Sequence, residues 1–312
     1  MPELRNEFTW SFSRRQTFES CRRRYWFRYY AFWGGWSRDA PELSRKAYFF
    51  SKMATVRMLL GSAVHETINN LLRALQSGRE PTNPFDQVRS RMNDAWRASK
   101  EERWRSVGPK QAPPLFEHYY GIAVPVEETT RLREQAQRCV RGFLESDVYR
   151  SIVRAGAASF RSIDTLEVAE LGGVACFVAP DFAFDDGGTT WLLDWKTGAE
   201  RDDHELQLLA YAEFARQKWR LDPAKMRATD LMLDDGRTLE VKIDAARLAG
   251  AAETIRASAQ AMRAVLADPA QNVASRATLA PTTDVRECRR CFFREICDER
   301  PADPEPFAAA AP

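Results

Sequence analysis

The middle of the chain carries two apolar runs, rich in β-branched and aromatic residues, whose pattern predicts strands. They are GVACFVAPDFAF at 173–184 and TTWLLDWKTG at 189–198, with the turn residues Asp185–Gly188 between them. A further strand is predicted at about 164–171. A last strand pair is predicted within 231–243, where LMLDD and TLEVKI flank a tight turn at Asp235-Gly236.

Other parts of the chain have the period of an amphipathic helix. After Gly61, apolar residues recur at Val64, Ile68, Leu71, Leu72 and Leu75, which predicts a helix over 61–77. A second helix is predicted at ELQLLAYAEFARQKW, directly after the central strands. Helices are also expected at 84–106, 127–150 and 244–267.

Two carboxylates and one ammonium are expected at the end of the central hairpin. If the hairpin turns about Gly187, Asp181 lies within about a residue of Asp194 on the partner strand. Strand alternation puts Lys196 on the same face as Asp194. Such a group can hold a hard divalent cation and stabilise the charge that develops in phosphodiester hydrolysis. The alternative is a surface hairpin with solvated charges.

Three polar side chains outside the hairpin are candidates for the same site. His65 lies at the margin of the apolar stripe of helix 61–77, where a histidine is often only a satisfied boundary residue. Gln207 and Tyr211 lie one turn apart on the helix after the Asp-x-Lys strand. An amide and a phenol there could orient a phosphate or a water, or could form an ordinary polar margin.

These segments occur in an order that resembles the RecB-like branch of the PD-(D/E)xK nuclease superfamily. The matching motifs are Gly61-x-x-x-His65, Pro180-Asp181, Asp194-x-Lys196-Thr197-Gly198 and Gln207-x-x-x-Tyr211. The resemblance implies that His65, Asp181 and Asp194 bind Mg²⁺ or Mn²⁺ and that Lys196 is the catalytic lysine. It makes Gln207 and Tyr211 the supporting motif. Position 194 is Asp where many relatives have Glu, which shortens the ligand arm by about one C–C bond.

The six cysteines give a second, independent signal, because three of them cluster as Cys288-x2-Cys291-x5-Cys297. The chain starts with a polar, mixed segment and no signal peptide, so we expect a reducing, cytoplasmic location and no disulfide framework. Three clustered thiols suggest a metal or cluster site that needs a fourth ligand. Cys21 is the natural candidate, whereas Cys139 and Cys176 are expected to be small core residues.

One upstream cysteine with a C-terminal Cys-x2-Cys-x5-Cys also resembles the iron-sulfur staple of AddB-type and CRISPR-adaptation nucleases. The resemblance implies a 4Fe–4S cluster held by Cys21, Cys288, Cys291 and Cys297. Zinc is the alternative, since tetrahedral thiolate sites suit it, although the sequence has one Cys-x2-Cys pair rather than two.

Composition excludes a polycationic protein, because 46 basic and 44 acidic residues leave a net charge of only +2. Nucleic-acid contacts must therefore come from local patches. The clearest patch interleaves aromatic residues with guanidinium groups, a mixture that suits single strands or frayed ends. Its arginines are Arg14, Arg15, Arg22, Arg23, Arg24 and Arg28. The alternative is that the aromatic residues pack around the cluster and the arginines form a solvated face, and we expect both in part.

The predicted fold is α/β, with a restriction-endonuclease-like core in which helices flank a central mixed sheet. The prediction adds a helical insertion and a subdomain in which an iron-sulfur cluster joins the N-terminal and C-terminal segments. No run is long enough to span a membrane. The expected segments are an N-terminal arm (1–60), the His-bearing helix (61–77), the helical insertion (78–160), the nuclease core (161–268), the cluster-binding segment (269–300) and a disordered tail (301–312).

We therefore expect a metal-dependent DNA nuclease, an exonuclease acting on single strands or free ends, in DNA repair, recombination or defence. One alternative is a nuclease that trims DNA for CRISPR spacer acquisition. An alternative of another class is a non-catalytic DNA-binding or scaffold subunit for a helicase partner. The chain has no Walker A motif, so ATP-driven unwinding would need another chain.

Overall fold

The fold is taken from a computed structural model, which describes residues 5–199 and 204–302. The chain divides into two compact units. We call residues 56–96 and 124–255 the sheet unit, and residues 1–55, 97–123 and 256–312 the cysteine unit. Helices α5 (Pro84–Lys100) and α11 (Ala245–Ala264) each contain one boundary between the units.

The sheet unit is built on a mixed five-stranded sheet in the order β1-β4-β5-β6-β7. Strands β4 and β5 form the predicted antiparallel hairpin, β5 and β6 are parallel, and β6 and β7 are antiparallel. The strands of this sheet are β1 (Phe160–Ile163), β4 (Phe182–Asp186), β5 (Thr189–Lys196), β6 (Met226–Met232) and β7 (Thr238–Val241).

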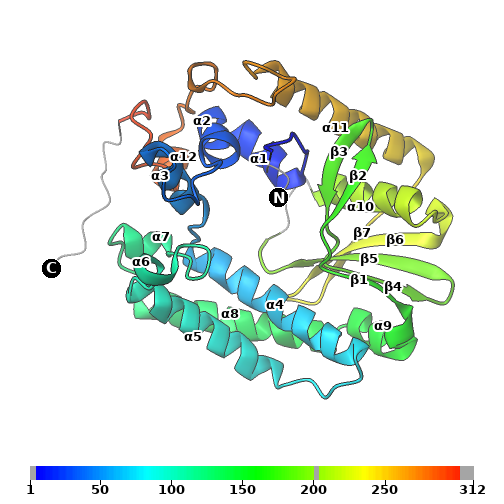
Figure 1. Cartoon of the computed structure of the whole chain (residues 1–312). Helices are drawn as coiled ribbons and strands as arrows, with labels where there is room; N and C mark the ends of the chain where they lie inside the picture. The colour runs from blue at the N-terminus through cyan, green and yellow to red at the C-terminus, as the bar shows by residue number, and fades with distance from the viewer. Residues whose placement is uncertain (1–4, 200–203, 303–312) are drawn as a thin grey trace. The chain divides into compact units, whose positions relative to one another are not determined.

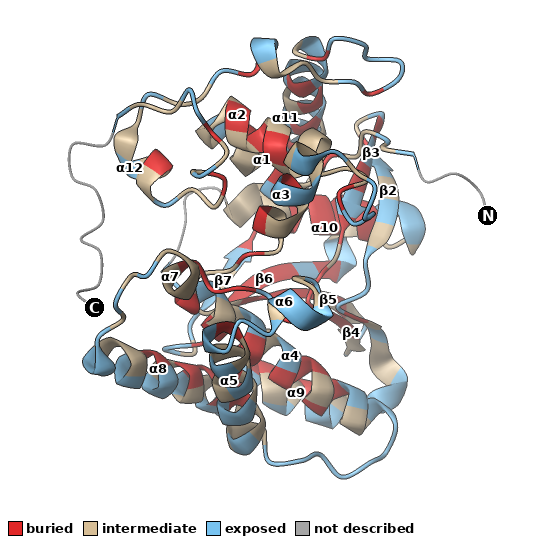
Figure 2. Cartoon of the chain, turned by 60° about the vertical axis from the view of Figure 1, so that its left-hand side comes forward, coloured by how far each residue is buried: buried red, intermediate tan, exposed pale blue. Residues whose placement is uncertain are grey.

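Helices cover both faces of this sheet (Figure 1). Helix α10 (His204–Lys218) packs on β5, β6 and β7 and supplies the crossover that a parallel strand pair requires. The other face carries α4 (Val56–Gln76), α8 (Val126–Glu145) and α9 (Asp147–Ala155). Residues Leu208–Ala215 of α10 are all buried, as Figure 2 shows by its red colour, so the middle of this helix is enclosed on every side.

The core of the sheet unit consists of large aromatic side chains between the sheet and its helices. Phe182 and Phe184 are fully buried and stack on each other, with 5.5 Å between ring centroids. Trp195 is 1% exposed and meets Phe143 of α8 edge-on. Burying each such ring contributes about 1.5–3 kcal/mol. This packing fixes the opposite face of β5, where Asp194 and Lys196 lie.

One strand predicted from the sequence folds as two separate strands. The run 173–184 is interrupted at Ala179–Asp181, which gives two strands instead of one. Its first half, β3 (Val174–Val178), pairs with β2 (Glu167–Leu171) in a separate two-stranded sheet, and its second half is β4. The interruption contains Pro180, which cannot donate a ladder hydrogen bond, and leaves Asp181 in an irregular segment immediately before β4.

The cysteine unit is helical. Its core groups Phe27, Phe50, Phe116, Phe293 and Cys297 with Ala47 and Met53. Its helices, apart from the ends of α5 and α11, are α1 (Phe12–Ser20), α2 (Arg22–Trp26), the π-helical η1 (Phe27–Ala31), α3 (Glu42–Ser51), α6 (Trp104–Val107), α7 (Phe116–Tyr119), η4 (Arg276–Thr278) and α12 (Val285–Arg289). The sheet unit adds two short 3₁₀ turns, η2 (Ala157–Ser159) and η3 (Pro223–Lys225).

The expected insertion at 78–160 is helical, but the structure does not group it as one body. Residues 97–123 belong to the cysteine unit, and the remainder of the insertion belongs to the sheet unit. Of the expected disordered tail, residues 303–312 lie outside the described residues. No helix in the described part of the chain has both the length and the apolar character to span a membrane.

Candidate active site and cysteine pocket

The β4–β5 hairpin brings Asp181 and Asp194 to neighbouring positions. Phe182 pairs with Leu193, so Asp181 and Asp194 follow next in the antiparallel register. Both carboxylates are buried, at 9% and 5% exposure. Burial raises the pKa of the Asp181 carboxyl, and the Asp194 carboxylate raises it further, which His65 only partly offsets. Two buried carboxylates that repel each other form a site that a cation would relieve.

Asp181 is held by the backbone of the partner strand and by helix α4. Its Oδ2 accepts a 2.6 Å hydrogen bond from the backbone N–H of Trp195, and its Oδ1 lies 3.2 Å from Nδ1 of His65. Burial lowers the pKa of His65, but the Asp181 carboxylate outweighs this and raises that pKa to about 9. A cation ligated by this imidazole must therefore displace a proton.

Asp194 and Lys196 share a network with the two polar residues of α10. Lys196 Nζ lies 2.6 Å from Asp194 Oδ2 and donates to Gln207 Oε1 at 3.0 Å. Gln207 Nε2 donates to Asp194 Oδ1 at 3.0 Å, and Tyr211 donates to the same oxygen at 2.8 Å. All four side chains thus belong to one hydrogen-bonded group.

The charges of this network follow from its burial. Burial lowers the pKa of the Lys196 ammonium, but the Asp194 and Asp230 carboxylates outweigh burial and leave that pKa raised. Burial, with Asp194 in second place, raises the pKa of Tyr211 well above its ordinary value. Lys196 therefore stays cationic, and Tyr211 stays a protonated hydrogen-bond donor.

Sequence reasoning missed four residues of the site. Asp230 on β6 pairs in register with Asp194 on β5, and one of its oxygens lies 3.8 Å from Lys196 Nζ. Its other oxygen lies 3.0 Å from Nδ1 of His204, at the start of α10. A polar residue inside the apolar run ATDLML was the only sequence signal for Asp230.

The remaining two missed residues, Asn69 and Asp164, hold the segment that carries Asp181. Asn69, one turn after His65 on α4, donates to Asp164 Oδ2 at 3.0 Å. The backbone N–H of Asp164 donates to the backbone oxygen of Asp181 at 2.9 Å. Asp164 has φ 46°, a conformation that Asp tolerates better than most residues. This contact ties helix α4 to the Asp181 segment.

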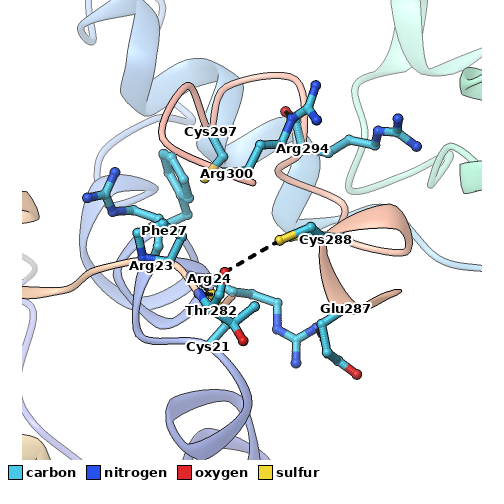
Figure 3. Close-up of a pocket in the computed structure, with 12 residues that line it drawn as sticks. Cys21, Arg23, Arg24, Phe27, Thr282, Glu287, Cys288, Arg294, Cys297 and Arg300 are labelled. Atoms are coloured by element: carbon cyan, nitrogen blue, oxygen red, sulfur yellow. Dashed lines mark hydrogen bonds and ion pairs between the residues drawn. The ribbon is translucent and has the colours of Figure 1, made fainter. Parts of the chain in front are cut away.

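In the cysteine unit, Cys21, Cys288, Cys291 and Cys297 line a single pocket. Figure 3 shows three of these thiols around it, together with Arg23, Arg24, Arg294 and Arg300. Cys21 Sγ accepts weak hydrogen bonds from the backbone N–H groups of Arg24 and Thr282, both at 3.4 Å. Burial raises the pKa of Cys291 to about 12, and burial also raises the pKa values of Cys288 and Cys297. None of the four forms a disulfide.

The other two cysteines, Cys139 and Cys176, belong to the sheet unit and are fully buried in it. Among residues 5–199 and 204–302, no three His, Cys, Asp or Glu side chains are arranged to hold a metal ion as they stand. A metal at either place would therefore require its ligands to draw together.

The predicted nucleic-acid patch contains two arginines that are interior residues. Arg14 is 4% exposed and bonds Tyr25, Tyr30 and the Thr9 carbonyl. Arg23 is 1% exposed and bonds Glu299 and the carbonyls of residues 276 and 279. Arg14 and Arg23 are therefore not part of a surface that nucleic acid could contact.

Four of the predicted arginines are half-buried. Arg15 pairs with Glu19, Arg24 pairs with Glu287, and Arg22 lies over the Phe18 ring. Arg28, on η1, is also half-buried. The aromatic residues around Tyr25 pack on one another, so they are structural, as expected in part.

Comparison with protein families gives one result that covers nearly the whole chain. A model of the PD-(D/E)XK nuclease superfamily matches residues 9–298, which include the carboxylate network and the four cysteines that line the pocket. Membership implies a nuclease that acts on DNA, and nucleases of this superfamily typically use Mg²⁺ or Mn²⁺. Comparison with curated proteins found no match. The chain belongs to the PD-(D/E)XK nuclease superfamily.

Proposed function

We propose that the chain is a metal-dependent DNA exonuclease of the RecB-like branch, acting on single strands or free ends in DNA repair, recombination or defence. The observation that carries the proposal is the grouping of buried Asp181 and Asp194 with half-buried Lys196 at the ends of two paired strands. A solvated surface hairpin would leave these charges exposed and unconnected. Here they are enclosed and joined to Gln207 and Tyr211.

His65, Asp181 and Asp194 would hold Mg²⁺ or Mn²⁺. Carboxylate oxygens suit these hard cations, and the neutral imidazole of His65 would complete the ligand set. The mutual repulsion of two buried carboxylates is the feature of this chain that fits a cation. When bound, the cation would polarise the scissile phosphate and lower the pKa of an attacking water.

The chain's own groups have separate tasks in this proposal. Lys196 would orient the attacking water and stabilise the negative charge of the transition state. Gln207 and Tyr211 would hold Asp194 in one rotamer through hydrogen bonds of 3.0 and 2.8 Å. The Trp195 N–H would fix Asp181 in the same way. Positioning by such fixed contacts reduces the reorganisation needed during reaction.

The cysteine pocket would hold a 4Fe–4S cluster on Cys21, Cys288, Cys291 and Cys297. Thiolate ligands suit iron-sulfur clusters and zinc alike. The guanidinium groups of Arg23, Arg24, Arg294 and Arg300 line the same pocket and would offset the negative charge of four thiolates. Anaerobically purified protein should then contain about four iron and four sulfide per chain. If the protein instead contains stoichiometric zinc and no iron, the four cysteines bind Zn²⁺ and not a 4Fe–4S cluster.

Contacts with DNA would come from the half-buried arginines Arg15, Arg22, Arg24 and Arg28. Guanidinium groups bind backbone phosphates without reading sequence. Replacing Arg28 with Ala should weaken binding to single-stranded DNA and reduce its salt dependence. Arg14 and Arg23 are interior, so replacing them would test folding rather than binding.

The competing roles differ in what they require of the site. A nuclease that trims DNA for CRISPR spacer acquisition would use the same chemistry. This role therefore differs from the proposed one in its pathway, but it requires the same catalytic residues. A non-catalytic scaffold for a helicase would have no need of Asp181, Asp194 or Lys196, and the chain keeps all three.

The test is an assay on end-labelled single- and double-stranded DNA and RNA, with Mg²⁺, Mn²⁺ or EDTA. The proposal predicts metal-dependent shortening of single-stranded DNA from an end, blocked by EDTA. Internal cutting of closed circular single-stranded DNA would contradict the exonuclease mode. Binding without hydrolysis of any substrate would favour the scaffold role.

A further inference from the structure

Asp230 is a buried carboxylate at the centre of the sheet unit. It lies on β6 opposite Asp194 of β5 in the parallel register, and it is 1% exposed. A carboxylate removed from water is costly unless charges or hydrogen bonds compensate. Its presence among the apolar residues of this strand therefore needs an explanation other than packing.

The two oxygens of Asp230 face two basic side chains, neither in good hydrogen-bond geometry. Oδ1 lies 3.8 Å from Lys196 Nζ and has no hydrogen-bond partner. Oδ2 lies 3.0 Å from Nδ1 of His204, but that nitrogen is not aligned for a hydrogen bond either. Both contacts are within ion-pair distance, but neither is a well-formed hydrogen bond. Their contribution to the stability of the fold therefore does not explain why a carboxylate is buried here.

Lys196 has a reason to need a second carboxylate. Its present anionic partner is Asp194, at 2.6 Å. In the proposed function Asp194 also binds the metal cation, and a cation and an ammonium on one carboxylate repel each other. Of the carboxylates that the structure describes, Asp230 is the other one within ion-pair distance of Lys196.

We infer that Asp230 and His204 form a positioning pair for Lys196. Asp230 holds the ammonium at the site while Asp194 serves the cation, and His204, 3.0 Å from the other Asp230 oxygen, packs against that carboxylate and limits its rotation. This inference rests on the proposed function, because it assigns Asp194 to a metal.

The test compares Asp230→Asn, His204→Ala and His204→Asn with Asp234→Asn as a matched control. Asp234 is an exposed carboxylate two residues beyond the end of β6, paired with Arg138. Loss of an outer partner of a metal site typically costs about 10–100-fold. Asp230→Asn and His204→Ala should therefore lower kcat by about this factor. KM and the Mn²⁺ concentration for half-maximal activity should stay close to wild type.

His204→Asn should recover part of the activity lost in His204→Ala, because the amide can donate near the position of Nδ1. A purely structural role would give no such recovery at equal thermal stability. If Asp230→Asn instead raises the Mn²⁺ requirement and regains full kcat at saturation, Asp230 is a metal ligand and the inference is overturned. Unchanged kcat in both Asp230→Asn and His204→Ala also overturns it.

A second readout needs neither metal nor activity. In metal-free protein labelled with ¹⁵N at lysine Nζ, the Lys196 signal can be assigned by its loss in Lys196→Arg. That signal should shift in Asp230→Asn and His204→Ala and stay in place in Asp234→Asn. If the wild type hydrolyses no nucleic acid, the proposed function fails, and the signal still decides whether Asp230 holds Lys196. A signal unmoved in Asp230→Asn overturns the inference.

Discussion

Replacing Asp230 with Asn should make the metal-free protein more stable at neutral pH. The substitution keeps the shape of a side chain that is 1% exposed and removes its charge. Burial raises the pKa of the Asp230 carboxyl to about 6, helped by the repulsion of the Asp194 carboxylate, although Lys196 and His204 lower it. In the folded protein, desolvation and the repulsion of Asp194 together therefore cost the Asp230 carboxylate more free energy than its attraction to Lys196 and His204 returns.

The sign and size of the effect follow from this pKa. The ordinary value is 3.8, so the carboxyl binds its proton more tightly in the folded chain than in the unfolded chain. The corresponding stability is complete below pH 3.8 and is lost as the pH rises through about 6. A shift of about two pH units corresponds to at most about 3 kcal/mol. Because Asn has no carboxyl to ionise, Asp230→Asn should not lose this part of its stability as the pH rises.

The assay is urea unfolding followed by tryptophan fluorescence, in EDTA, at pH 5, 6, 7 and 8. The unfolding midpoint of Asp230→Asn should exceed that of the wild type, and the difference should grow from pH 5 to pH 7 and then level off. Asp234→Asn should follow the wild type throughout. A variant that is less stable than the wild type at pH 7 and pH 8 would refute the reasoning, because Asp230 would then be a net stabilising residue.

Three other substitutions test separate parts of the account. His65→Ala should raise the Mn²⁺ concentration for half-maximal activity, because a lost ligand weakens metal binding; a variant that cannot fold would instead show a core histidine. Asn69→Ala should lower the free energy of unfolding by about 1–3 kcal/mol, measured in urea, because Asp164 loses its donor; no change would make that contact incidental. Cys288→Ser should lower the thermal midpoint of anaerobic protein well beyond the effect of Cys176→Ser; if a cluster closes the chain, the loss in free energy of unfolding should approach about 4–5 kcal/mol. Equal effects of the two cysteine variants would contradict a shared metal site.

The local part of the site could be predicted from the sequence because it depends on short-range rules. Two strands joined by a glycine turn fix the register that makes Asp181 and Asp194 neighbours. Period-two alternation then places Lys196 beside Asp194, and helical period places Gln207 and Tyr211 together. Each of these relations spans fewer than about twenty residues and has one dominant geometry.

The missed part depends on long-range pairing. Asp230 reaches Asp194 only through the parallel register of β5 and β6, which the crossover helix α10 sets and no local pattern reveals. The split of run 173–184 was missed for a related reason, because apolar residues on both sides of Pro180 read as one strand.

Burial of charge was the other failure of sequence reasoning. Arg14 and Arg23 lie in a segment whose charge density predicts a surface. Arg23 is compensated by Glu299 and two backbone carbonyls more than 250 positions away in the sequence. Such distant partners cannot be identified from composition, so a buried arginine looks the same as an exposed one.

The most direct test of the central claim compares wild type with Lys196→Ala on 5′-labelled single-stranded DNA in Mn²⁺. Lys196 is 26% exposed at a strand end, so its truncation should leave folding and DNA binding nearly intact. The account predicts that the wild type shortens the DNA, that EDTA stops the reaction, and that Lys196→Ala binds the DNA without cutting it. Cleavage by Lys196→Ala at the wild-type rate would contradict the account.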